Sequence, residues 1–281
     1  MSTHAMNRRI PVSAAVVAAL AGTLAVTGCG SSGHPAPSHS PARAPAAVRG
    51  FDEAGVSTGT GDNFTPADWK TIRADGFTVF ITDPIRWSSE CAGNGCSRAV
   101  TSCTIDPSAV AQLQDAESAG LDIAVYTRNV NCLPAAISGL PPALRAHLSF
   151  AVLDIEPGPG IPLTSHLIEQ VTALGQTPVV YSYSAGWQAV MGASTAFSSH
   201  PLMDAQAPGS GQPYPAPYPA GYPVLRPMPA PYGGWSGIPP IEQQQTNAAI
   251  QGSAGTIGGP ANAVDLDSVS ASWLASLPHH S

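Results

Sequence analysis

Short apolar runs alternate along this chain with segments in which apolar side chains recur every three or four positions. The runs predict buried strands, and the recurring spacing predicts helices with one buried face. The expected strands are Gly50–Ala54, Phe77–Thr82, Leu121–Thr127, Ser149–Glu156, Pro178–Tyr183, Leu202–Gln206, Ile241–Gln245 and Ala263–Leu266. The expected helices are Thr65–Ala74, one between Asp106 and Gly120, Pro141–His147, Leu163–Leu174 and Ala185–Met191.

Local signals mark where helices begin. Thr65 and Asp106 each precede a proline, which combines an N-cap side chain with a ring that fits the first helical turn. The alternation of strands and helices predicts a parallel sheet, and about eight strands in one domain favour a closed barrel. No helix is predicted between the last two strands. The predicted fold is therefore α/β, an irregular TIM-like (β/α) barrel of about eight strands.

One predicted strand is apolar until it ends in two acids, Asp154 and Glu156. Side chains two positions apart on a strand point to the same side, so these carboxyl groups project together. Glycoside hydrolysis uses such a pair, one carboxyl protonated and the other ionised. The alternative is structural, with the pair capping a helix or binding arginine or backbone amides. Other acids near predicted strand ends are Asp52, Asp83, Asp204 and Asp265.

Residues 1–28 have the pattern of an export signal. Arg8 and Arg9 precede the apolar stretch Ala14–Val26, and small residues then lead to Cys29. The string before Cys29 resembles the lipobox of bacterial lipoproteins, which implies acylation of Cys29. The alternative is a transmembrane anchor, but that needs about 20 apolar residues, more than this stretch has. Residues 29–48, rich in Pro, Ser and Ala, predict a tether, and residues 49–281 the barrel domain.

Charge narrows the possible partners. The chain has 11 Lys and Arg against 18 Asp and Glu, a net charge of −7 at pH 7, and Lys70 is its only lysine. No basic patch or stripe is present in the sequence, so nucleic acid is not an expected partner.

Four cysteines remain besides Cys29, an even number in a chain predicted to be exported, and this predicts disulfides. Four cysteines allow three pairings, and the sequence does not choose among them. A zinc site is the alternative, although the spacings do not form two Cys-x-x-Cys pairs. The four residues are Cys91, Cys96, Cys103 and Cys132.

The order of several motifs resembles the family 25 glycoside hydrolases, the lysozymes of muramidase type. Gly50-Phe51-Asp52 matches that family's first strand, and Leu153-Asp154-Ile155-Glu156 matches its central Asp-x-Glu strand. Further matches are Pro178–Tyr183 followed by Trp187, then Tyr232–Trp235, Ile241–Gln244 and Val264–Asp267. Together they extend over nearly the whole predicted domain.

The resemblance implies a lipid-anchored glycoside hydrolase that cleaves β-1,4 bonds of peptidoglycan. Glu156 would be the general acid with a raised pKa, and Asp154 would stabilise developing positive charge or orient the substrate's N-acetyl group. The implied partners are peptidoglycan glycan strands and, through Cys29, the outer face of the cytoplasmic membrane. We expect a monomer that needs no metal or cofactor. The implied substrate-binding residues are Asp52, Asp265, Tyr181 and Asp204.

Some features depart from the family pattern. Thr127-Arg128-Asn129 and Met203-Asp204 stand where related enzymes have apolar or aromatic residues. Lost aromatic rings remove sugar stacking, so one alternative is a non-catalytic glycan-binding lipoprotein with a degenerate groove. The loop Tyr214–Pro223 is either an aromatic lid or wall-binding strip, or a solvated polyproline-like insertion. A metal-dependent hydrolase using Mg²⁺ or Ca²⁺ and a related family of glycoside hydrolase-like lipoproteins are further alternatives.

Overall fold

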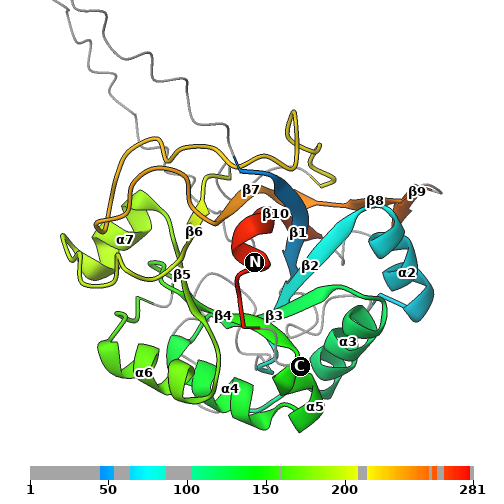
Figure 1. Ribbon diagram of the computed structural model, residues 1–281, viewed down its shortest axis with the longest axis horizontal. Coiled ribbons are helices and arrows are strands. Elements are labelled where there is room, and N and C mark those ends of the chain that lie inside the picture. Colours follow the sequence, from blue (N-terminus) through cyan, green and yellow to red (C-terminus); the bar gives the residue numbers. More distant parts are fainter. Residues whose placement is uncertain are drawn as a thin grey trace, which may run out of the picture. The chain divides into compact units, whose positions relative to one another are not determined.

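The computed structural model describes residues 45–53, 64–86, 103–158, 160–207, 214–252, 255–257 and 263–278. The barrel strands are β1 (Ala47–Glu53), β2 (Phe77–Thr82), β3 (Asp122–Thr127), β4 (Leu148–Asp154), β5 (Pro178–Ser182), β6 (Leu202–Ala205), β7 (Ile241–Ala248) and β10 (Val264–Ser270). They form a closed barrel in the order β1-β10-β7-β6-β5-β4-β3-β2 (Figure 1). The predicted irregular barrel of about eight strands is confirmed.

The barrel is mixed rather than parallel throughout. Strand β10 is antiparallel to both of its neighbours, β1 and β7, whereas the other neighbouring pairs are parallel. A parallel return needs a long crossover, usually a helix, and only the short strands β8 (Ile250–Gly252) and β9 (Gly255–Ile257) are described between β7 and β10. The prediction of a parallel sheet is therefore wrong for β10.

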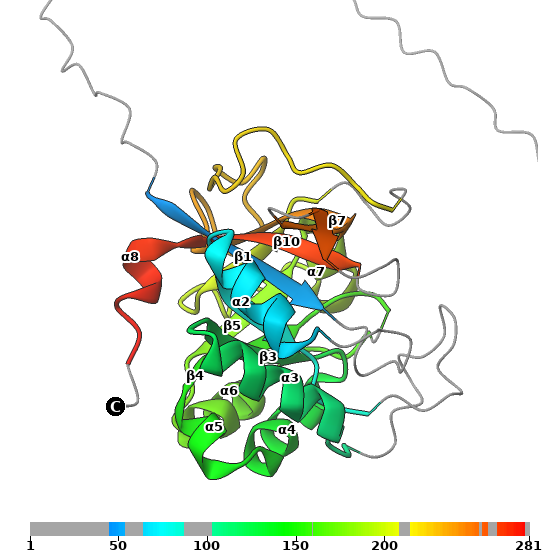
Figure 2. The same ribbon diagram turned by 90° about the vertical axis from the view of Figure 1, so that its right-hand side faces the viewer.

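Helices cover the outer face of the barrel beside β2 to β5, and α8 follows β10 at the end where β1 begins (Figures 1 and 2). The predicted N-caps Thr65 and Asp106 are confirmed, because each side chain accepts a backbone N–H of the first turn. The helices are α2 (Pro66–Ala74), α3 (Pro107–Ser118), η3 (Val130–Cys132), α4 (Leu133–Gly139), α5 (Pro142–Ala146), α6 (Ser165–Ala173), α7 (Ser184–Met191) and α8 (Ala271–Leu274).

Apolar side chains fill the barrel interior over most of its length. Leu274 of α8 and Leu277 complete this core at the end where β1 begins. Alternation along each strand sends every second side chain inward, so the polar inward positions fall at the opposite end. The inward apolar residues include Val79, Ile81, Ala124, Phe150, Val152, Val179, Met203, Ile241 and Val269.

The Gly-Phe-Asp sequence of β1 shows how this alternation places an acid. Phe51 packs outside the barrel against Trp69 of α2, with ring centroids 6.0 Å apart. Gly50 faces inward, and a Cβ there would lie only 3.2 Å from the Val269 side chain. Asp52, two positions after Gly50, faces inward as well. The glycine thus lets β1 lie close to the apolar core, and the aspartate lies at the polar end of the barrel interior.

Residues 214–240, which we call the strap, cover the outer face of the barrel where no helix separates β6 from β7. Tyr222 is 8% exposed and its hydroxyl donates to the Gly50 carbonyl oxygen at 2.7 Å. Trp235 is 7% exposed and donates from Nε1 to the His200 carbonyl oxygen at 2.9 Å. The described part of the Pro- and Tyr-rich loop is therefore packed against the barrel wall rather than solvated.

Cys103 and Cys132 form a disulfide, with an S–S distance of 2.01 Å and a Cα–Cα distance of 5.1 Å. This selects one bridge that the sequence left open; Cys91 and Cys96 lie outside the described residues. Cys29, the predicted signal and residues 29–44 of the predicted tether lie outside them too, and β1 begins at Ala47, slightly before the predicted boundary. Within the described ranges, every helix is too short or too polar to cross a membrane.

Candidate active site

Acids and a tyrosine occupy the inward positions at the barrel end remote from α8. Asp154 is the Cα partner of Tyr181 on β5, and Asp52 is the Cα partner of Asp265 on β10. Asp265 lies at the start of its strand and still reaches this end, because β10 runs antiparallel to its neighbours. The structure therefore brings together four residues predicted from distant parts of the sequence.

Gln243 of β7 links three of these side chains. Its Nε2 donates to Asp52 Oδ2 at 2.9 Å and to Asp265 Oδ2 at 3.4 Å. Its Oε1 accepts from the Tyr181 hydroxyl at 3.0 Å. Asn247 donates its backbone N–H to Asp265 Oδ1 at 3.0 Å from a backbone φ of 61°, which asparagine tolerates. These bonds fix the orientation of both carboxyl groups.

Asp154 and Glu156, the predicted catalytic pair, lie in different surroundings. Asp154 is 4% exposed, and its Oδ1 has no hydrogen-bond partner among the described residues. Burial, and then the neighbouring charge of Glu156, raise the pKa of Asp154 well above its ordinary value. The Glu156 side chain is 21% exposed. Asp154 is thus suited to hold a proton, and Glu156 is the member of the pair that a ligand reaches from solvent.

A further inward acid, Asp267, lies deeper in the barrel. It is fully buried, and within the described part of the chain neither carboxyl oxygen has a hydrogen-bond partner. Burial and then the charges of Asp52 and Asp265 raise the pKa of Asp267 well above its ordinary value. Burial and Asp265 do the same for the pKa of Asp52, and burial raises the pKa of Asp265 to about 6. Ionising Asp52, Asp265 and Asp267 all at once would bring three negative charges together where the dielectric constant is low. The cluster therefore holds protons more readily than isolated carboxyl groups do.

Arg128 brings positive charge to the same end. Its Nη2 lies 3.7 Å from Glu156 Oε1, and 47% of its side chain is exposed. Its backbone N–H donates to Asp83 Oδ2 at 3.3 Å, while Asp83 Oδ1 accepts the Ile85 N–H at 2.9 Å. Asp83 therefore fixes the backbone that carries Arg128. The contact with Glu156 is an ion pair longer than a hydrogen bond.

Tyr183, directly after β5, supplies an aromatic ring near the predicted catalytic pair. The charges of Glu156 and Asp154 add to the burial that raises its pKa. A Cβ at Gly186 would lie 2.9 Å from the Tyr183 ring, so the glycine lets this ring pack against the first turn of α7. The ring remains partly exposed, as a sugar-stacking surface must be.

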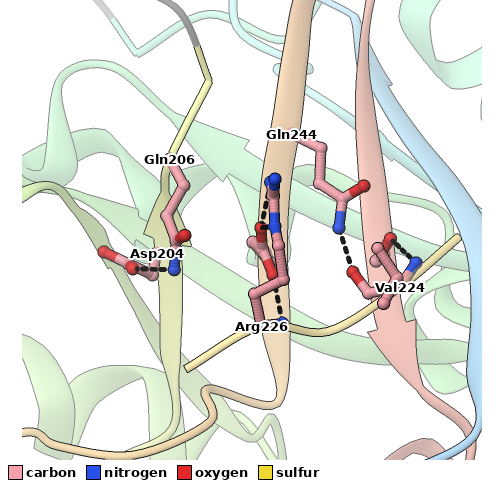
Figure 3. Close-up of polar contacts among 7 residues, drawn as sticks. Asp204, Gln206, Val224, Arg226 and Gln244 are labelled. Atoms are coloured by element: carbon pink, nitrogen blue, oxygen red, sulfur yellow. Dashed lines mark hydrogen bonds and ion pairs between the residues drawn. The ribbon is translucent and has the colours of Figure 1, made fainter. Parts of the chain in front are cut away.

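Asp204 does not join this group. Its Cα partners on the neighbouring strands, Ser182 and Glu242, belong to the outer face of the barrel. Asp204 Oδ1 accepts from the Tyr232 hydroxyl at 2.6 Å. Its Oδ2 accepts from Gln206 Nε2 at 2.8 Å (Figure 3). Burial raises the pKa of Asp204 against these bonds, which lower it. The predicted substrate-binding position thus contacts the strap instead.

Two further polar side chains of β7 face the strap. Glu242 is fully buried and accepts from the Arg226 backbone N–H and from its Nε, each at 2.7 Å. Gln244 donates to the Val224 carbonyl oxygen (Figure 3). The strap thus satisfies polar groups of the barrel's outer wall.

Sequence reasoning missed the site positions of Arg128, Gln243 and Asp267. Asp267 carries a usable signal, because it lies two positions after Asp265 and shares its face. Gln243 is one of three consecutive glutamines, so nothing in the sequence distinguishes it from its two neighbours. Arg128 directly follows β3, and its place in the site becomes clear only from the pairing of β3 with β4.

The described residues contain no group of three or more His, Cys, Asp or Glu side chains placed to hold a metal ion.

Comparison with solved structures finds similar folds in proteins that are named as a muramidase and an endolysin. The muramidase from Trichobolus zukalii matches with a TM-score of 0.52 and 18% identity, over 83% of this chain and 100% of that one. The CTP1L endolysin matches with a TM-score of 0.50 and 13% identity, over 81% of this chain and 68% of that one. No protein-family model and no curated protein match the chain. The fold is therefore muramidase-like, and the resemblance to family 25 is confirmed at the level of the fold.

Proposed function

We propose that the protein is a glycoside hydrolase that cleaves β-1,4 bonds of peptidoglycan, with Glu156 as general acid and Asp154 assisting. The observation that carries the proposal is the meeting of Asp52, Asp154, Glu156 and Asp265 at one end of a muramidase-like barrel. A buried carboxyl group beside a solvent-accessible one provides the two carboxyl groups that glycosidic bond cleavage uses.

The two proposed catalytic acids differ in burial, and this difference gives each of them a separate role. Glu156 reaches solvent and is the group that can contact the glycosidic oxygen, to which a general acid must deliver its proton. Asp154, whose pKa burial raises, carries no charge when protonated, and its carbonyl oxygen can still accept a hydrogen bond from the N–H of an N-acetyl group. Of the two roles implied by the resemblance, this favours orienting the substrate's N-acetyl group over stabilising positive charge.

The remaining inward residues supply binding and support. Asp52 and Asp265, oriented by Gln243, offer hydrogen-bonding oxygens at the floor of the site, and Tyr181 completes this network. Tyr183 offers the partly exposed ring on which a sugar face stacks.

The proposed location follows from the sequence. Acylation at Cys29 would anchor the chain to the outer face of the cytoplasmic membrane, and residues 29–48 would hold a monomeric barrel toward the wall glycan. The substrate and the enzyme would then share one compartment.

A second candidate is the non-catalytic glycan-binding lipoprotein, and one contact favours it. The ion pair with Arg128 requires Glu156 to be a carboxylate, whereas a general acid must carry a proton. On this alternative the barrel binds glycan strands without cleaving them.

Release of reducing ends from purified peptidoglycan separates the two candidates. Wild-type protein should release them, and Glu156→Gln should lower the rate about 10²- to 10⁴-fold, the contribution of a general acid. Glu169→Gln, on the exposed face of α6, is the matched control and should keep the wild-type rate. Wall binding without reducing ends from any of the three proteins would reject the hydrolase and favour the second candidate.

A further inference from the structure

Arg128 is a cation placed among acids. The positive charge of Arg128 lowers the pKa of Asp52, Asp154 and Asp265 against the burial that raises it. It contacts Glu156 at 3.7 Å, and nearly half of its side chain remains exposed. We propose that Arg128 determines specificity by binding a carboxylate group of the substrate sugar, and that this contact draws it away from Glu156. The inference rests on the proposed function and names the substrate class of that same site.

The local structure holds Arg128 ready for such a contact. Asp83 receives its backbone N–H, and the Asn129 side chain receives the Asn131 N–H at 3.2 Å as the N-cap of η3. Cys132, at the end of η3, is joined to Cys103. A backbone fixed at three neighbouring points loses little further entropy when the side chain binds, which favours a recognition role over a flexible surface one.

The surrounding charge makes Arg128 the place where an anion binds. Carboxyl groups repel an anionic ligand wherever they are ionised, whereas a guanidinium binds a carboxylate through charge-assisted, often bidentate, hydrogen bonds. Arg128 already engages a carboxylate, that of Glu156, at a distance too long for a hydrogen bond. A substrate carboxylate in closer geometry would compete successfully for the same cation.

The competition connects recognition with catalysis. While Arg128 faces Glu156, the guanidinium and the glutamate form an ion pair at 3.7 Å. Once a substrate carboxylate holds the guanidinium, Glu156 loses that partner and can turn to the glycosidic oxygen. A substrate without the carboxylate leaves the ion pair in place and reacts more slowly.

Two sources can provide this carboxylate in a peptidoglycan strand: the lactyl ether of the muramic sugar, when no peptide is attached, or an acid of the attached peptide. Three substrates distinguish them. The first is a peptide-free glycan strand with its lactyl acid, the second is the same strand with that acid converted to the methyl amide, and the third is a peptide-bearing strand. The first two match in shape and differ in charge.

The experiment measures kcat/KM and Kd of each strand with wild-type protein, Arg128→Gln and a matched arginine variant, Arg86→Gln. Arg86 faces Asp106 at the same 3.7 Å and is also exposed, but its acid is a helix N-cap outside the site. Wild type and Arg86→Gln should prefer the acid strand over the amide strand about tenfold or more in kcat/KM, the effect of one charge-assisted contact. Arg128→Gln should give equal kcat/KM values for the acid strand and the amide strand.

Each other outcome has a distinct meaning. A preference that survives in Arg128→Gln, or no preference in wild type, overturns the role of Arg128 while cleavage upholds the proposed function. Preference only for the peptide-bearing strand moves the recognised carboxylate from the sugar to the peptide, and so overturns the sugar assignment. Arg128-dependent binding of the acid strand without cleavage rejects the hydrolase and keeps the recognition. Failure to bind any strand rejects both.

Discussion

Two outer-face acids and two inner-face acids of the barrel are buried in opposite ways. On the outer face, Glu242 and Asp204 each accept hydrogen bonds from named partners at 2.6–2.8 Å, most of them on the strap. On the inner face, Asp267 has no hydrogen-bond partner among the described residues, and Asp154 leaves one oxygen without one. Buried acids with partners stabilise a fold, whereas buried acids without them carry raised pKa values that chemistry can use. Burial alone therefore does not identify a catalytic acid.

Two arginines allow this difference to be measured as stability. Arg226 and Arg128 have side chains equally exposed, at 47%, but Arg226 pairs with fully buried Glu242 and Arg128 pairs with Glu156, which is 21% exposed. Arg226→Ala should lower the free energy of unfolding by about 3–5 kcal/mol, because it leaves a buried charge without its cation. Arg128→Ala should lower it by less than about 1 kcal/mol, as for a surface pair. Urea unfolding of both variants tests this; equal losses would contradict the distinction.

The pH dependence of stability gives a smaller effect. Burial raises the pKa of Asp265 to about 6 and that of Glu53, which is 2% exposed, to about 8. In the unfolded chain both groups ionise near pH 4. Between these values the folded state binds more protons than the unfolded state, so the free energy of unfolding should fall as pH rises from about 4 to about 8.

The variant Glu53→Gln sharpens this prediction. It removes the group whose pKa burial raises to about 8, so the fall in stability between about pH 6 and pH 8 should become shallower than in the wild type. Lys70→Gln, which changes an exposed charge on α2, serves as the control and should keep the wild-type slope. Stability that rises with pH over this range would show that these acids are ionised and partnered in the folded protein.

Much of the fold and part of the site followed from periodicity. The apolar runs located the barrel strands, and the period of two placed Asp154 and Glu156 on one side of a strand end. Asp265 was expected at the end of a parallel strand and instead lies at the start of antiparallel β10. Both arrangements bring Asp265 to the same end of the barrel, so its location agrees with the prediction although the direction of its strand does not.

The remainder depends on contacts that a sequence pattern does not encode. Strand β6 is buried on both faces, so its four residues give no sign that Met203 faces inward and Asp204 outward. The strap covers the outer face of the barrel where the sequence pattern predicted no helix. The pattern did not predict the polar contacts between the strap and the barrel. The Cys103–Cys132 pairing and the Arg128–Glu156 contact likewise join residues far apart in sequence.

Two isosteric variants test most directly whether inner-face acids act and outer-face acids only support. Asp154 and Asp204 are both buried, at 4% and 2% exposure, on β4 and β6. Asp154→Asn should lower the rate of reducing-end release from peptidoglycan about 100-fold or more with little change in unfolding free energy. Asp204→Asn should lower the unfolding free energy by about 1–3 kcal/mol and keep the wild-type rate per folded molecule. An Asp154→Asn protein that cleaves at the wild-type rate, or an Asp204→Asn protein that folds stably but is inactive, would contradict the account.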